Sequence, residues 1–172
     1  MVGLPGETME DIKSIVSFIK EVKSSSGAQI NVSVNPLTPQ AHTPFQWLKC
    51  IDPDELARKI NYISTRSPAK VSGFDREKYI VESILTRGDK SYAKIVNRAA
   101  KEGALLQQSQ RYFSFEPWEK AFAAAGGSWE DYYYREFSLG EKLPWDYVEI
   151  GADKEFLKKN YKSAMKEAAR GK

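Results

Sequence analysis

Residues 3–35 read GLPGETMEDIKSIVSFIKEVKSSSGAQINVSVN. Gly3 and Gly6 permit positive φ and Pro5 fixes the φ between them, so the stretch opens with a turn. Thr8 is a helix N-cap candidate with Asp11 three residues on, a relative of the capping box. After it, apolar residues recur at the spacing of one helix face: Ile12, Ile15, Val16, Ile19 and Val22. The pattern predicts a helix with one buried stripe, ended by residues 24–27.

The next segment has the alternation of a β-strand. Ile30, Val32 and Val34 are separated by polar residues, which gives a strand with one apolar face. A turn, a helix and then a strand form the second half of a βα unit that feeds the next strand of a parallel sheet. Only Met1 and Val2 precede the glycine turn, so we expect the chain to start inside such a unit.

A proline-rich loop and a second unit follow. Prolines at 36, 39 and 44 predict an extended loop from Asn35 to Trp47 that cannot be helical. Asp52 and Pro53 form an N-cap and N1 pair. They open a predicted helix whose apolar stripe is Leu56, Ile60 and Ile63, and residues 69–73 favour another short strand.

From Asp75 the patterns are helical almost to the end. Pro117 and Ser128 open further helices, residues 143–146 interrupt the pattern, and a last helix starts near Asp153. The predicted apolar stripes of the first two helices are Tyr79, Ile80, Ile84 and Leu85, then Ala93, Val96 and Ala100. The fold class is therefore α/β followed by all-α, with predicted domains 1–72 and 73–172.

Composition limits the function classes. The 172 residues are 41% apolar and 28% charged, which suits a globular core and excludes a disordered chain. Residues 153–172 hold seven basic and three acidic side chains, and the rest of the chain holds 19 basic against 20 acidic. That balance argues against a nucleic-acid-coating protein. Residues 1–6 lack the charged and apolar regions of a signal peptide, and no apolar run is long enough to span a bilayer. The expectation is therefore a cytoplasmic protein without membrane contact.

Three features admit both a functional and a structural interpretation. The glycine turn suits a polar or anionic ligand at a helix start, or is a plain capped turn. The loop around His42, the only histidine, either shapes a ligand pocket or plugs the fold, and one histidine is weak evidence for a metal. Cys50, the only cysteine, excludes an internal disulfide and favours a buried thiol over a nucleophile.

The helical part carries two further patterns. Its aromatic residues are expected to form the core, with base stacking as the alternative: Trp118, Phe122, Trp129, Tyr132, Tyr133, Tyr134 and Phe137. On the last helix, Lys154, Lys158 and Lys162 share one face, which is either solvated or a contact for RNA or an acidic protein.

Several motifs together resemble one enzyme family. Gly3-Leu4-Pro5-Gly6-Glu7-Thr8-x-Glu10-Asp11 resembles the turn after the fifth strand of radical S-adenosylmethionine (radical SAM) enzymes. Residues 32–47 resemble the sixth strand and following loop of their cobalamin-binding-type branch of Fe–S oxidoreductases. The later pieces resemble the helical extension of the same proteins: Leu85-x-Arg87-Gly88-Asp89, Phe115-x-x-Trp118, Trp129, Tyr134-x-Glu136 and Leu143-Pro144-Trp145-Asp146.

The resemblance implies a fold and a set of cofactors. Such enzymes have a partial (β/α)6, TIM-like barrel in which three cysteines spaced C-x3-C-x2-C hold a [4Fe–4S] cluster. That cluster binds S-adenosylmethionine and cleaves it reductively to a radical. This sequence contains none of the three cysteines. It therefore resembles the carboxyl-terminal part of such an enzyme, with the last one or two βα units and a helical domain. Such a part is expected to be inactive alone. The resemblance leaves open whether the parent protein carries a cobalamin domain upstream.

The resemblance also implies positions for a site. It places Gly3, Pro5, Gly6 and Glu7, with the strand end Val34 and Asn35, beside S-adenosylmethionine. A substrate-rim loop would contain Pro39, His42, Thr43, Pro44, Phe45 and Trp47. It assigns no catalytic residue and no metal ligand. The implied partner is the missing barrel portion or a second copy of the chain, and the alternative function is a helical RNA- or protein-binding module without catalytic activity.

Overall fold

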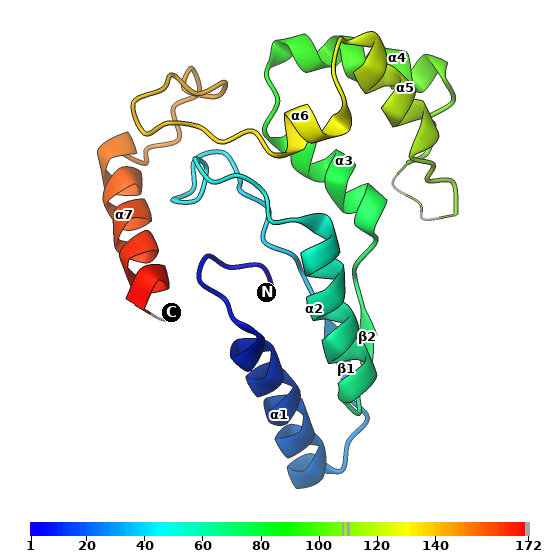
Figure 1. The fold of residues 1–172 in the computed structure, drawn as a ribbon, viewed down its shortest axis with the longest axis vertical. Coiled ribbons are helices and arrows are strands. Elements are labelled where there is room, and N and C mark those ends of the chain that lie inside the picture. The colour runs from blue at the N-terminus through cyan, green and yellow to red at the C-terminus, as the bar shows by residue number, and fades with distance from the viewer. Residues whose placement is uncertain (108, 110, 171–172) are drawn as a thin grey trace. The chain divides into compact units, whose positions relative to one another are not determined.

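The computed structural model describes residues 1–107, 109 and 111–170 (Figure 1). Two compact units are present. The first contains residues 1–37, 51–76 and the chain from Asn160, and the second contains residues 38–50 and 77–159. The domain division at residues 72 and 73 stays a prediction.

The described chain is mostly helical, with one small parallel sheet. The elements of the first unit are α1 (Met9–Ser26), β1 (Asn31–Ser33), α2 (Pro53–Arg66) and β2 (Lys70–Ser72). The chain continues through α3 (Arg76–Thr86), the 3-10 helix η1 (Lys90–Tyr92), α4 (Ala93–Lys101), α5 (Glu116–Ala124), α6 (Trp129–Tyr133) and α7 (Lys154–Arg170). The residues of α7 from Asn160 onward belong to the first unit. No helix of the described residues is long and apolar enough to cross a membrane.

The sheet joins two consecutive βα units. β1 pairs in parallel with β2, with Val32 opposite Val71. On the other side, Val2 forms a parallel bridge with Pro36. The chain therefore runs from Val2 through α1 to β1, and through α2 to β2, which confirms the predicted parallel arrangement. The described residues form no closed barrel.

Helix α1 forms as its caps and spacing predict. Thr8 and Asp11 make a reciprocal capping box, and Gly27 ends the helix with φ 64°. The buried side chains are Ile12, Val16 and Ile19, so the stripe is narrower than predicted. In α2, Asp52 Oδ1 accepts the N–H groups of residues 54 and 55 at 3.0 and 2.8 Å. Its predicted stripe is buried.

Aromatic side chains form much of the core of the second unit. Trp118, Phe122, Tyr133 and Phe137 are buried, as predicted for the helical part. Tyr133 meets the ring of Tyr79 edge to face at 6.2 Å between centroids. Trp129, Tyr132 and Tyr134 are half-buried, so burial accounts for four of the seven rings predicted for the core.

The predicted stripe of α4 is wrong. Ile95 and Ala99 are the buried side chains, whereas Val96 is 42% exposed and Ala93 and Ala100 are exposed. Burying Ile95 with Ala99 one turn later removes the larger apolar side chain from water, and this outweighs the spacing of the alanines.

Candidate functional site

The glycine turn lies beside the end of a strand. The N–H of Val2 donates to the Asn35 carbonyl at 3.1 Å, and the N–H of Leu37 donates to the Val2 carbonyl at 2.8 Å. These bonds bring the turn that follows Val2 next to the chain around Val34 and Asn35. Val34 is buried and Asn35 is exposed. The structure therefore brings the two predicted S-adenosylmethionine segments together at the carboxyl ends of parallel segments, where α/β folds bind ligands.

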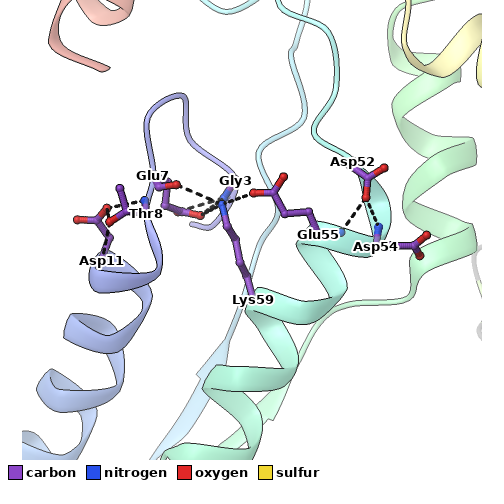
Figure 2. Close-up of polar contacts among 8 residues, drawn as sticks. All are labelled: Gly3, Glu7, Thr8, Asp11, Asp52, Asp54, Glu55 and Lys59. Atoms are coloured by element: carbon purple, nitrogen blue, oxygen red, sulfur yellow. Dashed lines mark hydrogen bonds and ion pairs between the residues drawn. The ribbon is translucent and has the colours of Figure 1, made fainter. Parts of the chain in front are cut away.

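Glu7 closes the turn on itself (Figure 2). Its two carboxylate oxygens accept the N–H of Gly3 at 3.0 and 3.1 Å. Gly3 and Gly6 both have positive φ, at 95° and 79°, which a glycine adopts without strain. The Glu7 carboxylate, which would repel an anionic ligand, is therefore already hydrogen-bonded within the turn.

Lys59 of α2 neutralises this carboxylate. Its Nζ lies 3.0 Å from a Glu7 carboxylate oxygen, and both side chains are 6% exposed. The same Nζ lies 3.0 Å from Glu55 one helical turn earlier. Burial alone would lower the pKa of Lys59, but hydrogen bonds and charges from Glu55 and Glu7 raise it above its ordinary value.

Sequence reasoning missed Lys59. Its position, three residues after Leu56 and four before Ile63, lies on the buried stripe of α2. A lysine at a core position of an amphipathic helix is a signal for a buried partner, because a charge there is retained only when it is paired.

The last turn of α7 packs against Gly6. A Cβ at this residue would lie 2.7 Å from the Cα and the carbonyl oxygen of Ala168. Beside the turn is an open depression of about 820 Å³, lined in part by Pro5, Thr8 and Glu167. The missing side chain of Gly6 therefore makes room for a helix backbone, and a ligand at this turn would lie beside α7.

The predicted rim loop is held together by Gln46. Gln46 Oε1 accepts the backbone N–H of His42 at 3.0 Å and the indole N–H of Trp145 at 2.6 Å. His42 adopts φ 57°, a conformation that side-chain-bearing residues seldom take. Gln46 itself is 2% exposed and was not among the predicted site residues.

The other predicted rim residues divide into two kinds. Pro39 and Trp47 are fully buried, so they anchor the loop in the core of the second unit. Thr43, Pro44 and Phe45 are half-buried, and Thr43 Oγ1 donates to a loop carbonyl at 2.8 Å. The loop is thus partly a plug and partly a wall of a pocket.

That pocket, which we call the His42 pocket, has a volume of about 490 Å³. Its polar wall consists of His42, Gln46, Asp146, Glu149 and Lys154. Its apolar wall includes Val148, Ile150 and Leu157. Two motifs that the resemblance named separately, the loop of residues 39–47 and the segment of residues 143–146, therefore meet in one place.

Asp146 organises the charged side of the pocket. Its Oδ2 accepts the N–H of Leu143 at 2.8 Å and lies 2.5 Å from Lys154 Nζ. Burial alone would raise the pKa of Asp146, but the hydrogen bonds from Lys154 and Leu143, with the charges of Lys154 and His42, lower it below its ordinary value. The carboxylate is therefore ionised at neutral pH.

Cys50 is buried beside Arg87. The guanidinium Nη1 lies 3.6 Å from the Cys50 Sγ, and Arg87 is only 4% exposed. Burial raises the pKa of the Cys50 thiol despite this neighbouring charge. Among residues 1–107, 109 and 111–170, no group of three histidine, cysteine or acidic side chains is placed to hold a metal ion.

Comparison with known proteins gives partial, distant similarities. The chain is 31% identical over 111 residues to an uncharacterised protein of Methanocaldococcus jannaschii, an alignment that covers 62% of this chain and 24% of that protein. It is 28% identical over 114 residues to the ribosomal protein uS12 methylthiotransferase RimO of Leptospira biflexa, covering 64% of this chain and 22% of the enzyme. The chain thus spans about a quarter of the length of these relatives. No protein-family model matches it, and no solved structure is significantly similar.

Proposed function

We propose that this chain is the carboxyl-terminal portion of a radical SAM enzyme. In this proposal its first unit contributes the last two βα units of a partial barrel. The observation that carries it is the parallel run from Val2 to β2 with a glycine turn at its carboxyl edge. The similarity to a methylthiotransferase over 64% of the chain supports the enzyme class.

The cysteine content decides which cofactor these residues fit. A [4Fe–4S] cluster with three cysteine ligands does not fit this chain, because it has one cysteine and that thiol is buried. In the proposal the cluster ligands belong to a preceding part of a longer protein. We assign no step of the reaction to a residue of this chain.

The glycine turn fits a supporting role toward S-adenosylmethionine. When bound beside a cluster, that group supplies a radical. The turn of Gly3 to Glu7 and the exposed Asn35 would border it, while the Glu7–Lys59 pair holds the turn in shape. In the proposal, the loop from Pro39 to Trp47 is a rim on the substrate side. RimO is named for ribosomal protein uS12, and the proposal assigns no substrate to this chain.

The first experiment is to read the coding DNA upstream of Met1. The proposal expects an in-frame or adjacent segment that encodes C-x3-C-x2-C. Its absence would remove the catalytic interpretation for this gene product.

The second experiment tests the site in the complete gene product after anaerobic reconstitution. Formation of 5′-deoxyadenosine is measured against S-adenosylmethionine concentration for Asn35→Ala and, as a control, Asn31→Ala. Both asparagines are exposed, but Asn31 is the first residue of β1, whereas Asn35 lies two residues after its carboxyl end. Asn35→Ala should raise the half-saturating concentration several-fold, and Asn31→Ala should leave it unchanged. Equal values for both variants would contradict a cofactor site at this strand end.

One structural observation argues against RNA binding by the lysine face of the last helix, which is the main support for the interaction-module alternative. Lys154 is paired with Asp146, and Lys158 lies 2.6 Å from Glu155. Two of the three lysines of the predicted basic face are therefore neutralised. RNA binding that weakens steeply with salt would support the alternative, which stays a prediction.

A further inference from the structure

We infer that the His42 pocket binds a small zwitterion of amino-acid type: a ligand with a carboxylate, an ammonium group and an apolar side chain. The inference concerns the second unit alone and does not rest on the proposed function. It is argued from four features of this pocket: its volume, its N–H groups that remain available to a ligand, its positively and negatively charged side chains, and its apolar wall.

The volume sets the size of the ligand. About 490 Å³ lies within the range that small-molecule sites occupy. The pocket is lined by two segments far apart in sequence, because His42 and Gln46 come from the loop and the other lining residues from positions 146–157. The ligand is therefore a small molecule held between two segments in a pocket that is open on one side.

Gln46 supplies a fixed donor. Its side chain is 2% exposed, and its Oε1 is occupied by the two N–H donors from His42 and Trp145. The amide Nε2 has no hydrogen-bond partner among the residues that the structure describes. A buried amide that lines a pocket with its oxygen saturated offers its N–H groups to an acceptor such as a carboxylate.

Lys154 lies on the same wall. Its Nζ pairs with Asp146 and donates to the Glu141 carbonyl at 3.3 Å. An ammonium has three N–H groups, so one remains for a ligand. Together with the Gln46 amide, it gives the pocket two donors for one carboxylate.

The acceptor side of the pocket is anionic. Asp146 Oδ2 is engaged by Leu143 and Lys154, and its Oδ1 accepts no hydrogen bond from any described residue. Glu149 is exposed on the same lining and forms no ion pair within the described chain. These oxygens suit an ammonium group, whereas a phosphate or other polyanion would meet two negative charges.

The rest of the lining selects the ligand's third group. Val148, Ile150 and Leu157 provide apolar contact, so a branched aliphatic side chain fits better than a charged one. L-Leucine has the required groups and serves as the probe. 4-Methylpentanoate lacks its ammonium group and 3-methylbutylamine lacks its carboxylate.

The sole histidine makes the measurement direct. In the full chain, selective labelling of histidine gives one imidazole signal, and it comes from the lining of this pocket. Leucine should shift that signal saturably, with an affinity about tenfold or more above either single-charge analogue, since tenfold corresponds to one additional charged contact of about 1.4 kcal/mol. Absence of a saturable shift up to about 10 mM leucine, or equal binding of all three probes, would overturn the inference.

Variants assign the two charges. Glu149→Gln changes an exposed side chain, so it leaves the fold intact, and it should weaken leucine and 3-methylbutylamine but not 4-methylpentanoate. Lys154→Met should weaken leucine and 4-methylpentanoate but not the amine. Lys158→Met, on the same helix and outside the lining, is the matched control. If Glu149→Gln leaves leucine binding unchanged, or if the control variant weakens it as much as the test variants do, the zwitterion assignment is wrong.

Discussion

The indole N–H of Trp145 donates a 2.6 Å hydrogen bond to Oε1 of Gln46, a residue 99 positions earlier. Both side chains are buried. This bond joins the proline-rich loop to the segment before α7, and the same oxygen also holds the strained backbone of His42. One amide therefore fixes the shape of the His42 pocket.

Trp145→Phe should destabilise the second unit. The substitution removes a donor and leaves the buried Gln46 oxygen with one partner instead of two, so the loss of one hydrogen bond costs about 0.5–1.5 kcal/mol of unfolding free energy. Urea unfolding followed by circular dichroism measures it. Tyr147→Phe, at a side chain that is 84% exposed, is the control and should change stability little. Equal midpoints for both variants would mean that the hydrogen bond does not stabilise the loop.

Lys59→Met should destabilise the first unit strongly. It leaves the Glu7 carboxylate buried without its cation, a change that costs about 3–5 kcal/mol. Adding Glu7→Gln should restore much of the loss, because the buried charge is then gone. The comparison is made by urea unfolding, with Lys13→Met, in an exposed pair, as the control. A double variant no more stable than Lys59→Met alone would contradict the role of the pair.

Stability should fall at acid pH through Asp146. Its pKa is lowered in the folded chain from an ordinary value of 3.8, so its contribution is present above about 3.8 and is lost as the pH falls through the folded value. Asp146→Asn should remove this part of the acid loss. Urea midpoints across that pH window, compared between wild type and variant, measure it, and identical acid slopes would disprove it.

Comparing Gly6→Ala with Gly27→Ala separates the cost of a side chain at positive φ from the cost of a clash with α7. Both glycines have positive φ, so each substitution costs about 1–2 kcal/mol from the backbone alone. Only at Gly6 would the added Cβ also meet the Ala168 backbone at 2.7 Å, whereas nothing lies within 4 Å at Gly27. Gly6→Ala should therefore lower the urea midpoint more. Equal losses would show that α7 does not pack on the turn.

The isolated chain should self-associate. Helix α1 exposes Phe18 (66%) and Val22 (38%) one turn apart, an apolar face that the remaining barrel would cover in the proposed parent. Sedimentation should detect oligomers, and Phe18→Glu should shift them toward monomer. A monomeric wild-type chain at micromolar concentration would count against the fragment proposal.

Sequence patterns predicted the local elements well, for identifiable reasons. Thr8 with Asp11, Asp52 with Pro53 and the alternation around Val32 each act within a few residues, so spacing alone reveals them. The predicted buried stripe of α4 was wrong because apolar residues lie at two neighbouring positions, Ile95 and Val96, and tertiary packing buries Ile95.

The long-range partners could not be predicted. Lys59 meets Glu7 from 52 positions away, and Trp145 meets Gln46 from 99. Neither pair has a local spacing that would mark it. His42 was a candidate because it is the only histidine. The Gln46 side chain that accepts its backbone N–H could be identified only from the structure of the loop.

The Glu7–Lys59 pair also restricts how this chain changes through evolution. Losing Lys59 first leaves the Glu7 carboxylate inside the first unit without its cation, whereas losing Glu7 first leaves Lys59 still paired with Glu55. Homologous chains should therefore keep Lys59 wherever they keep Glu7, and a neutral residue should replace Glu7 before Lys59 is lost. The order of the two changes is expected to be fixed, although half the first unit's sequence lies between the two positions.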